Sequence, residues 1–284
     1  MTERLADITA RIEGIRQLDA VVNAMRGIAA ARAQQARAQL TAVDSYAQAI
    51  AVAIARAVSL IPGDQHVRGS RSTRPALVLF CAEQGFAGAF SERVLDAARG
   101  DLATHELFLV GTRGVTAAAE RNVVPRWKSA MPSHSLGAPR LADRIAEALY
   151  VRVATGEIDA LDAIFTRWRP GRGTQIERRR LFPLDRTAFP VPAASDVPLL
   201  DLAPEALLSE LTAGYMHAQL CRAALHAFAA ENEARVEAMA SARHQIERQL
   251  SSLKARQRTV RQEEITAEII ELATGETASR PGFR

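Results

Sequence analysis

The chain has 284 residues, of which 48% are hydrophobic and 24% charged, and its formal net charge is +4. This length and apolar content exclude a disordered chain and predict either one compact domain with extensions or two domains. The two cysteines form no CxxC motif and the first residues, MTERLADITA, have no continuous apolar core, so we expect a reducing compartment, no signal peptide and no direct membrane insertion.

A long first helix is predicted to begin near Leu5 and to reach about residue 60. Apolar residues recur there at steps of three and four, at Ile8, Ile12, Ile15, Leu18, Val22, Met25 and Ala29. Such a helix would span roughly 80 Å. Gly14 and Gly27 lie inside it and each weakens it by about 1 kcal/mol, so packing against a partner must supply the stability.

A loop dense in Gly, Pro, Ser and Arg follows at residues 61–75, and alternating strands and helices begin after it. We predict a buried strand leading to a turn within ALVLFCAEQG (76–85) and a second strand at ELFLVGTRG. Helices are predicted at SERVLDAAR, opened by Ser91 as its N-cap, at VTAAAERN and at LADRIAEALYVRVATGE. The segments ALDAIFTRW and GRGTQIERRRLFPL read as two strands joined at Pro170-Gly171. This alternation implies a parallel sheet with helices on its faces, a Rossmann-like α/β domain over residues 75–186.

After a Pro-rich linker, AFPVPAASDVPLLDLAP, a second long helix is predicted over residues 204–276. Steps of seven along this helix give a coiled-coil-like seam in which Asn232 is the one polar interruption. The seam consists of Leu211, Ala218, Leu225, Asn232, Met239, Ile246, Leu253, Val260 and Ala267. With the first helix at 1–60, the expected fold is mixed α+β and α/β. The N- and C-terminal helices form a long antiparallel coiled coil, and the α/β domain lies between them in the sequence.

Nucleotide and metal sites are not predicted. The two lysines, Lys128 and Lys254, follow no glycine-rich loop, and Gly85-x-x-Gly88 lacks the full dinucleotide pattern, so a tight strand-to-helix turn is favoured. The six histidines have no metal-ligand spacing, so surface or helix-face roles are expected. We therefore expect no cofactor.

Cys81 and the arginine run at 178–180 could each carry a function, but each also has a structural interpretation. Cys81 lies in an apolar run and is expected to pack there rather than to act as a nucleophile with a distant histidine. The arginine run at 178–180 could grip nucleic-acid phosphates, but it has no interleaved aromatic residues. A solvated strand edge facing a protein partner is favoured, and no nucleic acid is expected.

Three stretches resemble the gamma subunit of F-type ATP synthases. RIEGIRQLDAVVNAMRGIAAAR (11–32) is similar to the opening helix of that family, although Leu18, Ala20 and Val22 depart from it. AEQGFAGAFS (82–91) is similar to the family motif SDRGLCGGLN, with Glu83 in place of Asp and Ala87 in place of Cys. ITAEIIELATGETA (265–278) fits the family's terminal signature, except that Glu276 replaces the usual Ala. The departures suggest a divergent or paralogous bacterial branch.

This resemblance implies a non-catalytic rotor subunit in the central stalk, which couples ion flow through the membrane c ring to ATP synthesis or hydrolysis. Its partners would be the alpha and beta subunits of the catalytic head, the epsilon subunit and the c ring, at the cytoplasmic face of the bacterial inner membrane. The residues implied to contact other subunits are Met25, Arg26, Arg32, Arg261, Gln262, Thr266 and Glu268.

Two other classes of protein stay open at this stage. One is a free α/β enzyme with helical extensions that dimerise. The other is an arginine-rich helical protein that binds nucleic acid, for which steeply salt-dependent DNA binding would be diagnostic.

Overall fold

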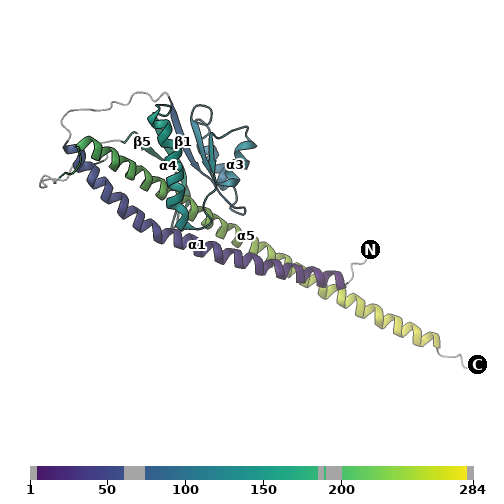
Figure 1. The fold of residues 1–284 in the computed structure, drawn as a ribbon. Coiled ribbons are helices and arrows are strands. Elements are labelled where there is room, and N and C mark those ends of the chain that lie inside the picture. The colour runs from purple at the N-terminus through teal and green to yellow at the C-terminus, as the bar shows by residue number, and fades with distance from the viewer. Residues whose placement is uncertain (1–4, 61–73, 185–188, 190–199, 280–284) are drawn as a thin grey trace, which may run out of the picture. The chain divides into compact units, whose positions relative to one another are not determined.

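The computed structural model describes residues 5–60, 74–184, 189 and 200–279 (Figure 1). Contacts within the chain divide it into two compact units, one of residues 29–235 and one of residues 1–28 together with 236–284. Helices α1 (Leu5–Ser59) and α5 (Pro204–Ser279) each contribute to both units. The domain boundaries expected from the sequence, 1–60, 75–186 and 204–276, stay a prediction.

The larger unit contains a five-stranded sheet in the order β3-β2-β1-β4-β5. Its strands are β1 (Pro75–Phe80), β2 (Glu106–Val110), β3 (Trp127–Ser129), β4 (Ala160–Arg169) and β5 (Gly173–Phe182). Strands β1 to β4 run parallel to one another, whereas the edge strand β5 pairs antiparallel with β4. The strand and turn predicted within 76–85 are present, and the strand ends at Phe80. Strand β3 has no counterpart in the prediction, because three residues give no periodic pattern.

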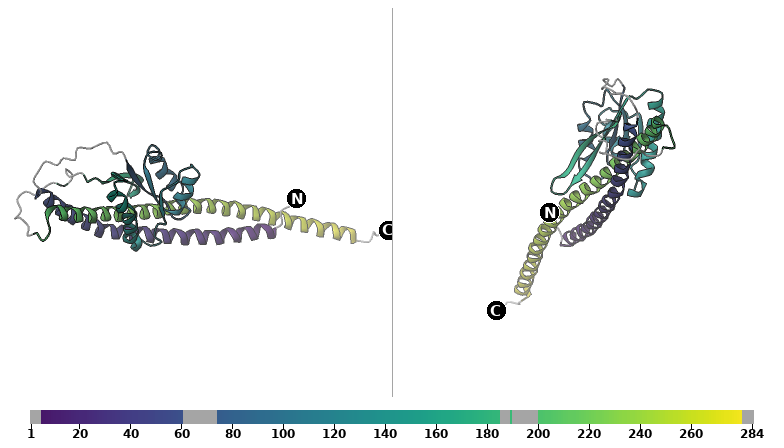
Figure 2. Two further views of the ribbon diagram at one scale, coloured as in Figure 1. Left: turned by 45° about the horizontal axis from the view of Figure 1, so that its top comes forward. Right: turned by 90° about the vertical axis from the view of Figure 1, so that its left-hand side faces the viewer.

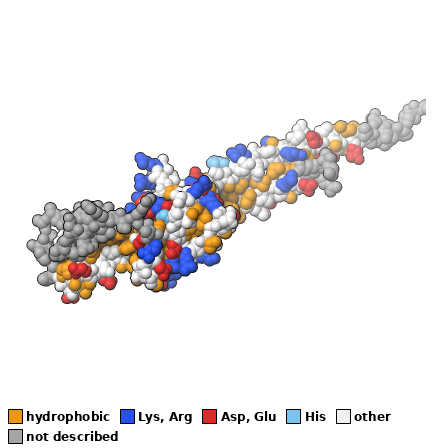
Figure 3. Space-filling model, turned by 90° about the horizontal axis from the view of Figure 1, so that it is seen from above, with side chains coloured by type: hydrophobic (Ala, Val, Ile, Leu, Met, Phe, Trp, Pro, Cys, Tyr) orange, Lys and Arg blue, Asp and Glu red, His pale blue; other side chains and the backbone are white. Residues whose placement is uncertain are grey.

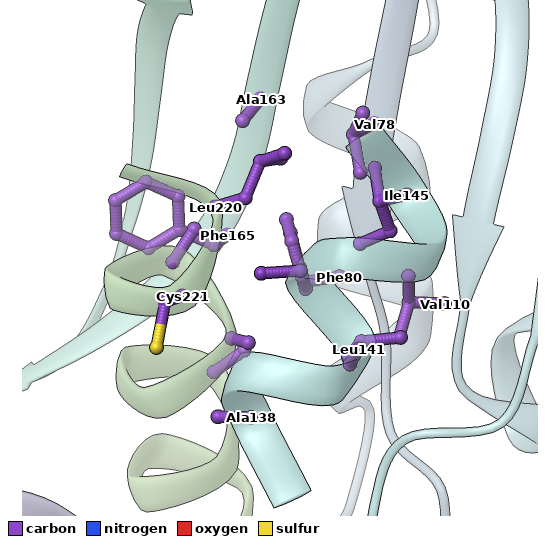
Figure 4. Close-up of a cluster of buried hydrophobic side chains, with 14 of the residues drawn as sticks. Val78, Phe80, Val110, Ala138, Leu141, Ile145, Ala163, Phe165, Leu220 and Cys221 are labelled. Atoms are coloured by element: carbon purple, nitrogen blue, oxygen red, sulfur yellow. The ribbon is translucent and has the colours of Figure 1, made fainter. Parts of the chain in front are cut away.

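Helices cover both faces of this sheet, as alternating strands and helices predict. One face packs against α2 (Phe90–Ala97) and α3 (Thr112–Ala119). The other packs against α4 (Ala138–Ala154), which follows a 3₁₀ turn at Ser135–Gly137, and against α5. Figure 4 shows this second core, where Phe80 and Phe165 from the strands meet Leu141 of α4 and Leu220 of α5.

The predicted N-cap of α2 is wrong. The helix begins at Phe90, its cap position is Ala89, and Ser91 lies in its first turn. The Ser91 hydroxyl is buried and accepts a hydrogen bond from the backbone N–H of Ala82 at 3.1 Å. The side chain therefore anchors the loop after β1 instead of capping the helix.

In the larger unit, α1 and α5 run antiparallel. Arg222 of α5 forms an ion pair with Asp44 of α1 at 2.7 Å, and further along α5 Glu233 pairs with Arg37, which precedes Asp44. Residues 216–235 of α5 are buried with few exceptions, because α1, α4 and the sheet all pack against them.

The smaller unit is a pair of antiparallel helices. Val22 of α1 forms a buried cluster with Met239 and Ile246 of α5. Nearer the start of α1, the Gln257 amide donates to the Thr9 hydroxyl at 2.9 Å. Within each unit, α1 and α5 can be followed alongside each other in the left view of Figure 2. Pairing of the terminal helices, expected from their periodicity, is confirmed in each unit.

The heptad seam of α5 is also confirmed over its central part. Its residues at 218, 225, 232, 239 and 246 are all buried, whereas 253 and 260 are half-buried and 267 is exposed. The predicted loop at 61–75 and the Pro-rich linker before α5 fall largely outside the described residues.

Candidate functional site

Four of the predicted contact residues lie on one exposed stretch of α5. Arg261, Gln262, Thr266 and Glu268 belong to residues 261–273, every one of which is exposed. The Thr266 hydroxyl donates to the backbone carbonyl of Gln262 at 2.8 Å. A partner that meets Thr266 would therefore donate a hydrogen bond to its oxygen.

The same stretch carries an exposed apolar stripe. Ile265, Ile269 and Leu272 are 49%, 60% and 74% exposed, and Ile270 beside them is 58% exposed. Their spacing of three and four places the three stripe residues on one helix face. In Figure 3, hydrophobic side chains lie among charged ones along the helical part of the surface. Contiguous exposed apolar residues between charges are typical of a protein–protein contact.

The predicted contact residues of α1 are less accessible. Met25 is half-buried and packs against the cluster of Val22, Met239 and Ile246. Arg26 and Arg32 are half-buried as well. Met25 therefore has a structural role in joining α1 to α5, and any contact that it makes with another subunit comes in addition to this packing.

A groove of about 470 Å³ lies between the two helices of the smaller unit. It is lined by Arg11, Gly14 and Ile15 of α1 and by Gln249, Ser252 and Leu253 of α5. A methyl group added at Gly14 would have no other atom within 4 Å, so the missing side chain helps to open this groove.

A buried polar cluster in the larger unit was missed by the sequence analysis. Glu231, Asn232 and Arg235 of α5 are 3%, 2% and 5% exposed. The Glu231 carboxylate accepts hydrogen bonds from the backbone N–H groups of Glu83 and Gln84, in the turn after β1. Asn232 interrupts the apolar seam and was the signal available in the sequence.

This cluster also settles how the glycine-containing turn is used. Gly88 has a φ of +59°, which suits the tight strand-to-helix turn that was favoured over a nucleotide site. Because the two N–H groups of the turn already bind Glu231, the chain's own carboxylate takes the place that a ligand phosphate would need.

The arginine run on β5 is engaged in ion pairs. Asp162 of β4 is 5% exposed, and its carboxylate pairs with Arg178 at 2.6 Å and with Arg180. Arg179 donates to the side-chain oxygen of Gln219 on α5 at 2.6 Å. These contacts tie the edge strand to the rest of the unit, which weakens the hypothesis of a phosphate-gripping surface.

One histidine departs from the expected surface or helix-face role. His226 of α5 is 7% exposed and stacks on Phe165, with ring centroids 5.8 Å apart. Burial, together with the charges of Arg167 and Arg222, lowers the pKa of His226 to about 3. The imidazole is therefore neutral at physiological pH and forms part of the core.

Both cysteines are buried and unpaired with each other. Burial raises the pKa of the Cys81 thiol to about 12 and that of Cys221 to about 11. A nucleophilic cysteine needs its thiolate form, so this environment disfavours a catalytic role for Cys81.

Across residues 5–60, 74–184 and 200–279, the structure brings no three His, Cys, Asp or Glu side chains into a cluster that could hold a metal ion. None of the described helices is long and apolar enough to cross a membrane.

The architecture defines a class of protein in which an α/β domain is attached to an antiparallel pair of terminal helices. The sequence model of the family described as ATP synthase matches residues 4–278. The chain therefore belongs to the ATP synthase family.

Curated relatives specify the subunit. The ATP synthase gamma chain of Beutenbergia cavernae is 29% identical, with 94% of this chain and 95% of that protein covered. The gamma chain of Acidothermus cellulolyticus is also 29% identical, with 94% of each chain covered. The prediction of an ATP synthase gamma subunit is confirmed.

Solved structures agree on the fold. A chain in the rotor of the Euglena gracilis mitochondrial ATP synthase superposes with a TM-score of 0.68 at 13% identity, covering 92% of this chain and 98% of that one. A chain from the central stalk and c ring of the Tetrahymena thermophila enzyme gives a TM-score of 0.55 at 15% identity, covering 78% and 99%. The contact roles of the individual residues stay a prediction.

Proposed function

We propose that this gamma subunit works as a non-catalytic shaft that passes torque between a membrane ring of c subunits and a catalytic head of alpha and beta subunits. The observation that carries the proposal is the stretch at 261–273 of α5, which is helical, exposed at every residue and apolar along one face. A helix end of this kind needs a surrounding protein surface.

The contacts follow from the chemistry of that stretch. Ile265, Ile269 and Leu272 would slide against an apolar collar formed by the head, because apolar contacts have no directional preference. Thr266 and Glu268 would form hydrogen bonds with loops of the beta subunits. Arg26, Arg32 and Arg261 would attract acidic loops over a longer range, in a salt-sensitive way.

Coupling of rotation to catalysis then depends on the asymmetry of the two-helix shaft. Two helices with different side chains present a different face to each of three beta subunits, so the three catalytic sites have different affinities for nucleotide. Rotation exchanges these faces, and each site passes through the same states in turn. The α/β domain would contact the epsilon subunit and the c ring, at the cytoplasmic face of a bacterial inner membrane.

The test is reconstitution of the complete complex in vesicles with variants of the exposed stretch. Replacing Ile265, Ile269 and Leu272 together by serine should lower ATP synthesis, because the apolar bearing surface is lost. A matched control replaces the exposed Glu263 and Glu264 by serine on the same turns. This control should retain more synthesis than the triple variant.

Partner identity is measured separately by capture of the tagged chain from native membranes, followed by mass spectrometry. Alpha, beta, epsilon and c subunits are the expected proteins. Equal synthesis rates for the triple variant, the control and the unaltered subunit would show that this stretch is not a bearing. Capture without alpha and beta subunits would refute the shaft itself.

A further inference from the structure

The turn after β1 binds a carboxylate of α5. The backbone N–H groups of Glu83 and Gln84 donate to the two oxygens of Glu231, each at 3.1 Å. Successive N–H groups that point at one anion form a concave binding site. Glu231 is 3% exposed, so this contact is made away from water, where it is stronger.

This turn lies where open α/β sheets place their ligands. β1 has β2 on one side and β4 on the other, and the chain reverses its direction of winding between β1 and β4. Ligands of such sheets bind outside the carboxyl ends of the strands at this switch point. Here Glu231 occupies the position, so a site suited to an anion serves to hold a helix.

Arg235 completes the contact from the next turn of α5. Its guanidinium donates to Glu231 at 2.6 Å, to the side-chain oxygen of Asn232 at 2.8 Å and to the backbone carbonyl of Gly85 at 3.1 Å. Glu231 therefore binds backbone N–H groups of the turn, and Arg235 binds one of its backbone carbonyls. Buried charges persist only when they are paired and hydrogen-bonded in this way.

Glu83 extends the contact across the sheet. Its carboxylate accepts from the backbone N–H of Thr112 at 3.0 Å, from the Thr112 hydroxyl at 2.7 Å and from the backbone N–H of Met131 at 2.8 Å. Thr112 follows β2 and Met131 follows β3. Directional bonds thus link α5 to segments at the carboxyl ends of three adjacent strands.

The face of α5 that is buried near this turn carries both small and large side chains. Ala223, Ala224, Ala227, Ala230 and Ala234 lie beside the larger Leu220, Leu225 and Phe228. Apolar burial opposes separation of two surfaces but has no preferred direction. The hydrogen bonds of Glu231 and Arg235 therefore add a directional restraint between the helix and the turn.

We propose that Glu231 and Arg235 are positioning residues that form the joint through which torque passes between α5 and the α/β domain. The inference rests on the proposed shaft function. Removing one partner leaves the other charge buried without compensation, so the turn is released from the helix. Under load the α/β domain then slips relative to α5.

The experiment compares Glu231→Gln with the unaltered subunit in the reconstituted complex. ATP hydrolysis is measured with and without an opposing ion gradient, together with the number of ions pumped per ATP. We expect hydrolysis without a gradient to be largely retained and ions pumped per ATP to fall severalfold. We also expect hydrolysis to lose its sensitivity to the gradient, a sign of slip that a loss of stability alone would not produce.

Glu106→Gln is the matched control. Glu106 of β2 pairs with Arg152 of α4, so this change breaks an ion pair inside the α/β domain instead of the contact between Glu231 and the turn. The control should pump like the unaltered complex. Equal losses in both variants, or full pumping by Glu231→Gln, would overturn the joint. Where Glu231→Gln does not fold, Arg235→Lys keeps the charge, loses the three-way donation and is tested in the same way.

Amide hydrogen exchange in the isolated full chain tests the joint independently of rotation. In the variant, exchange at Glu83 and Gln84 should accelerate while β1 stays protected. Unchanged exchange at these two amides would overturn the joint and leave the shaft function standing. A complex in which the unaltered chain supports no pumping refutes the shaft, and the joint with it.

Discussion

Proton binding linked to His226 is expected to contribute to the destabilisation of the larger unit at acidic pH. The pKa of this imidazole is about 3 in the folded chain, mainly because of burial and secondarily because of Arg167, against 6.5 in an exposed histidine. Since the folded pKa is depressed, the unfolded state binds the proton first. The resulting contribution to stability is complete above pH 6.5 and is lost progressively below it.

The magnitude follows from proton linkage. Between pH 7 and pH 5 an unfolded histidine becomes almost fully protonated while folded His226 stays neutral. Each pH unit well below 6.5 lowers the free energy of unfolding by roughly 1.4 kcal/mol, which gives about 2 kcal/mol over this range. The result depends on the unfolded pKa and hardly on the folded one, provided that the latter lies well below 5.

The assay is urea unfolding at both pH values, followed by tryptophan fluorescence. Both tryptophans, Trp127 of β3 and Trp168 of β4, lie in the larger unit, so the signal reports on the unit that contains His226. In His226→Phe the pH-dependent loss should shrink by about 2 kcal/mol, whereas His244→Gln, at an exposed site, should retain it. Equal pH dependence in His226→Phe and the unaltered chain would refute a neutral, buried His226.

Three further outcomes are expected. Gly14→Ala should raise the stability of the helix pair by about 1 kcal/mol, measured by thermal melting, because the added methyl meets no atom within 4 Å; a lower melting temperature would contradict this. Phe86 is 66% exposed and has a φ of +62°, a conformation that glycine adopts without strain. Phe86→Gly should therefore be more stable than Phe86→Ala by about 1 kcal/mol in a urea titration, and the reverse order would show that the turn is unstrained. Cys81 and Cys221 should resist maleimide at pH 8 until the chain is unfolded, as followed by mass spectrometry; rapid labelling of the folded chain would show that the thiols are accessible.

The helices and most strands could be predicted because their apolar periodicity continues over many residues. The seven-residue repeat of α5 can be found in the sequence by spacing alone, and its positions from Ala218 to Ile246 are buried in the structure. Ser91 shows the limit of local rules. A serine before a helical pattern is a good N-cap candidate. In the folded chain, however, the Ser91 hydroxyl accepts a hydrogen bond from the backbone N–H of Ala82, a contact that depends on tertiary packing.

The buried polar cluster could not be predicted because it depends on contacts between distant parts of the chain. Glu231 and Glu83 are separated by 148 residues along the sequence, and nothing local to either shows that one binds the backbone of the other. His226 was expected on a helix face for the same reason. It lies on a helix, but α5 is buried on nearly all sides at this point, so it has almost no exposed face.

One helix therefore meets two different environments along its length. Between 216 and 235, α5 is covered by the rest of the larger unit and satisfies its buried charges internally, as Glu231 and Arg235 show. Between 261 and 273 every residue is exposed, yet Ile265, Ile269 and Leu272 keep the spacing of a buried face. Isolated helical segments of this length are marginal in water. Under the proposed shaft function, we expect a surface of the catalytic head to cover this apolar spacing, and the helix to gain its full stability when that surface closes around it.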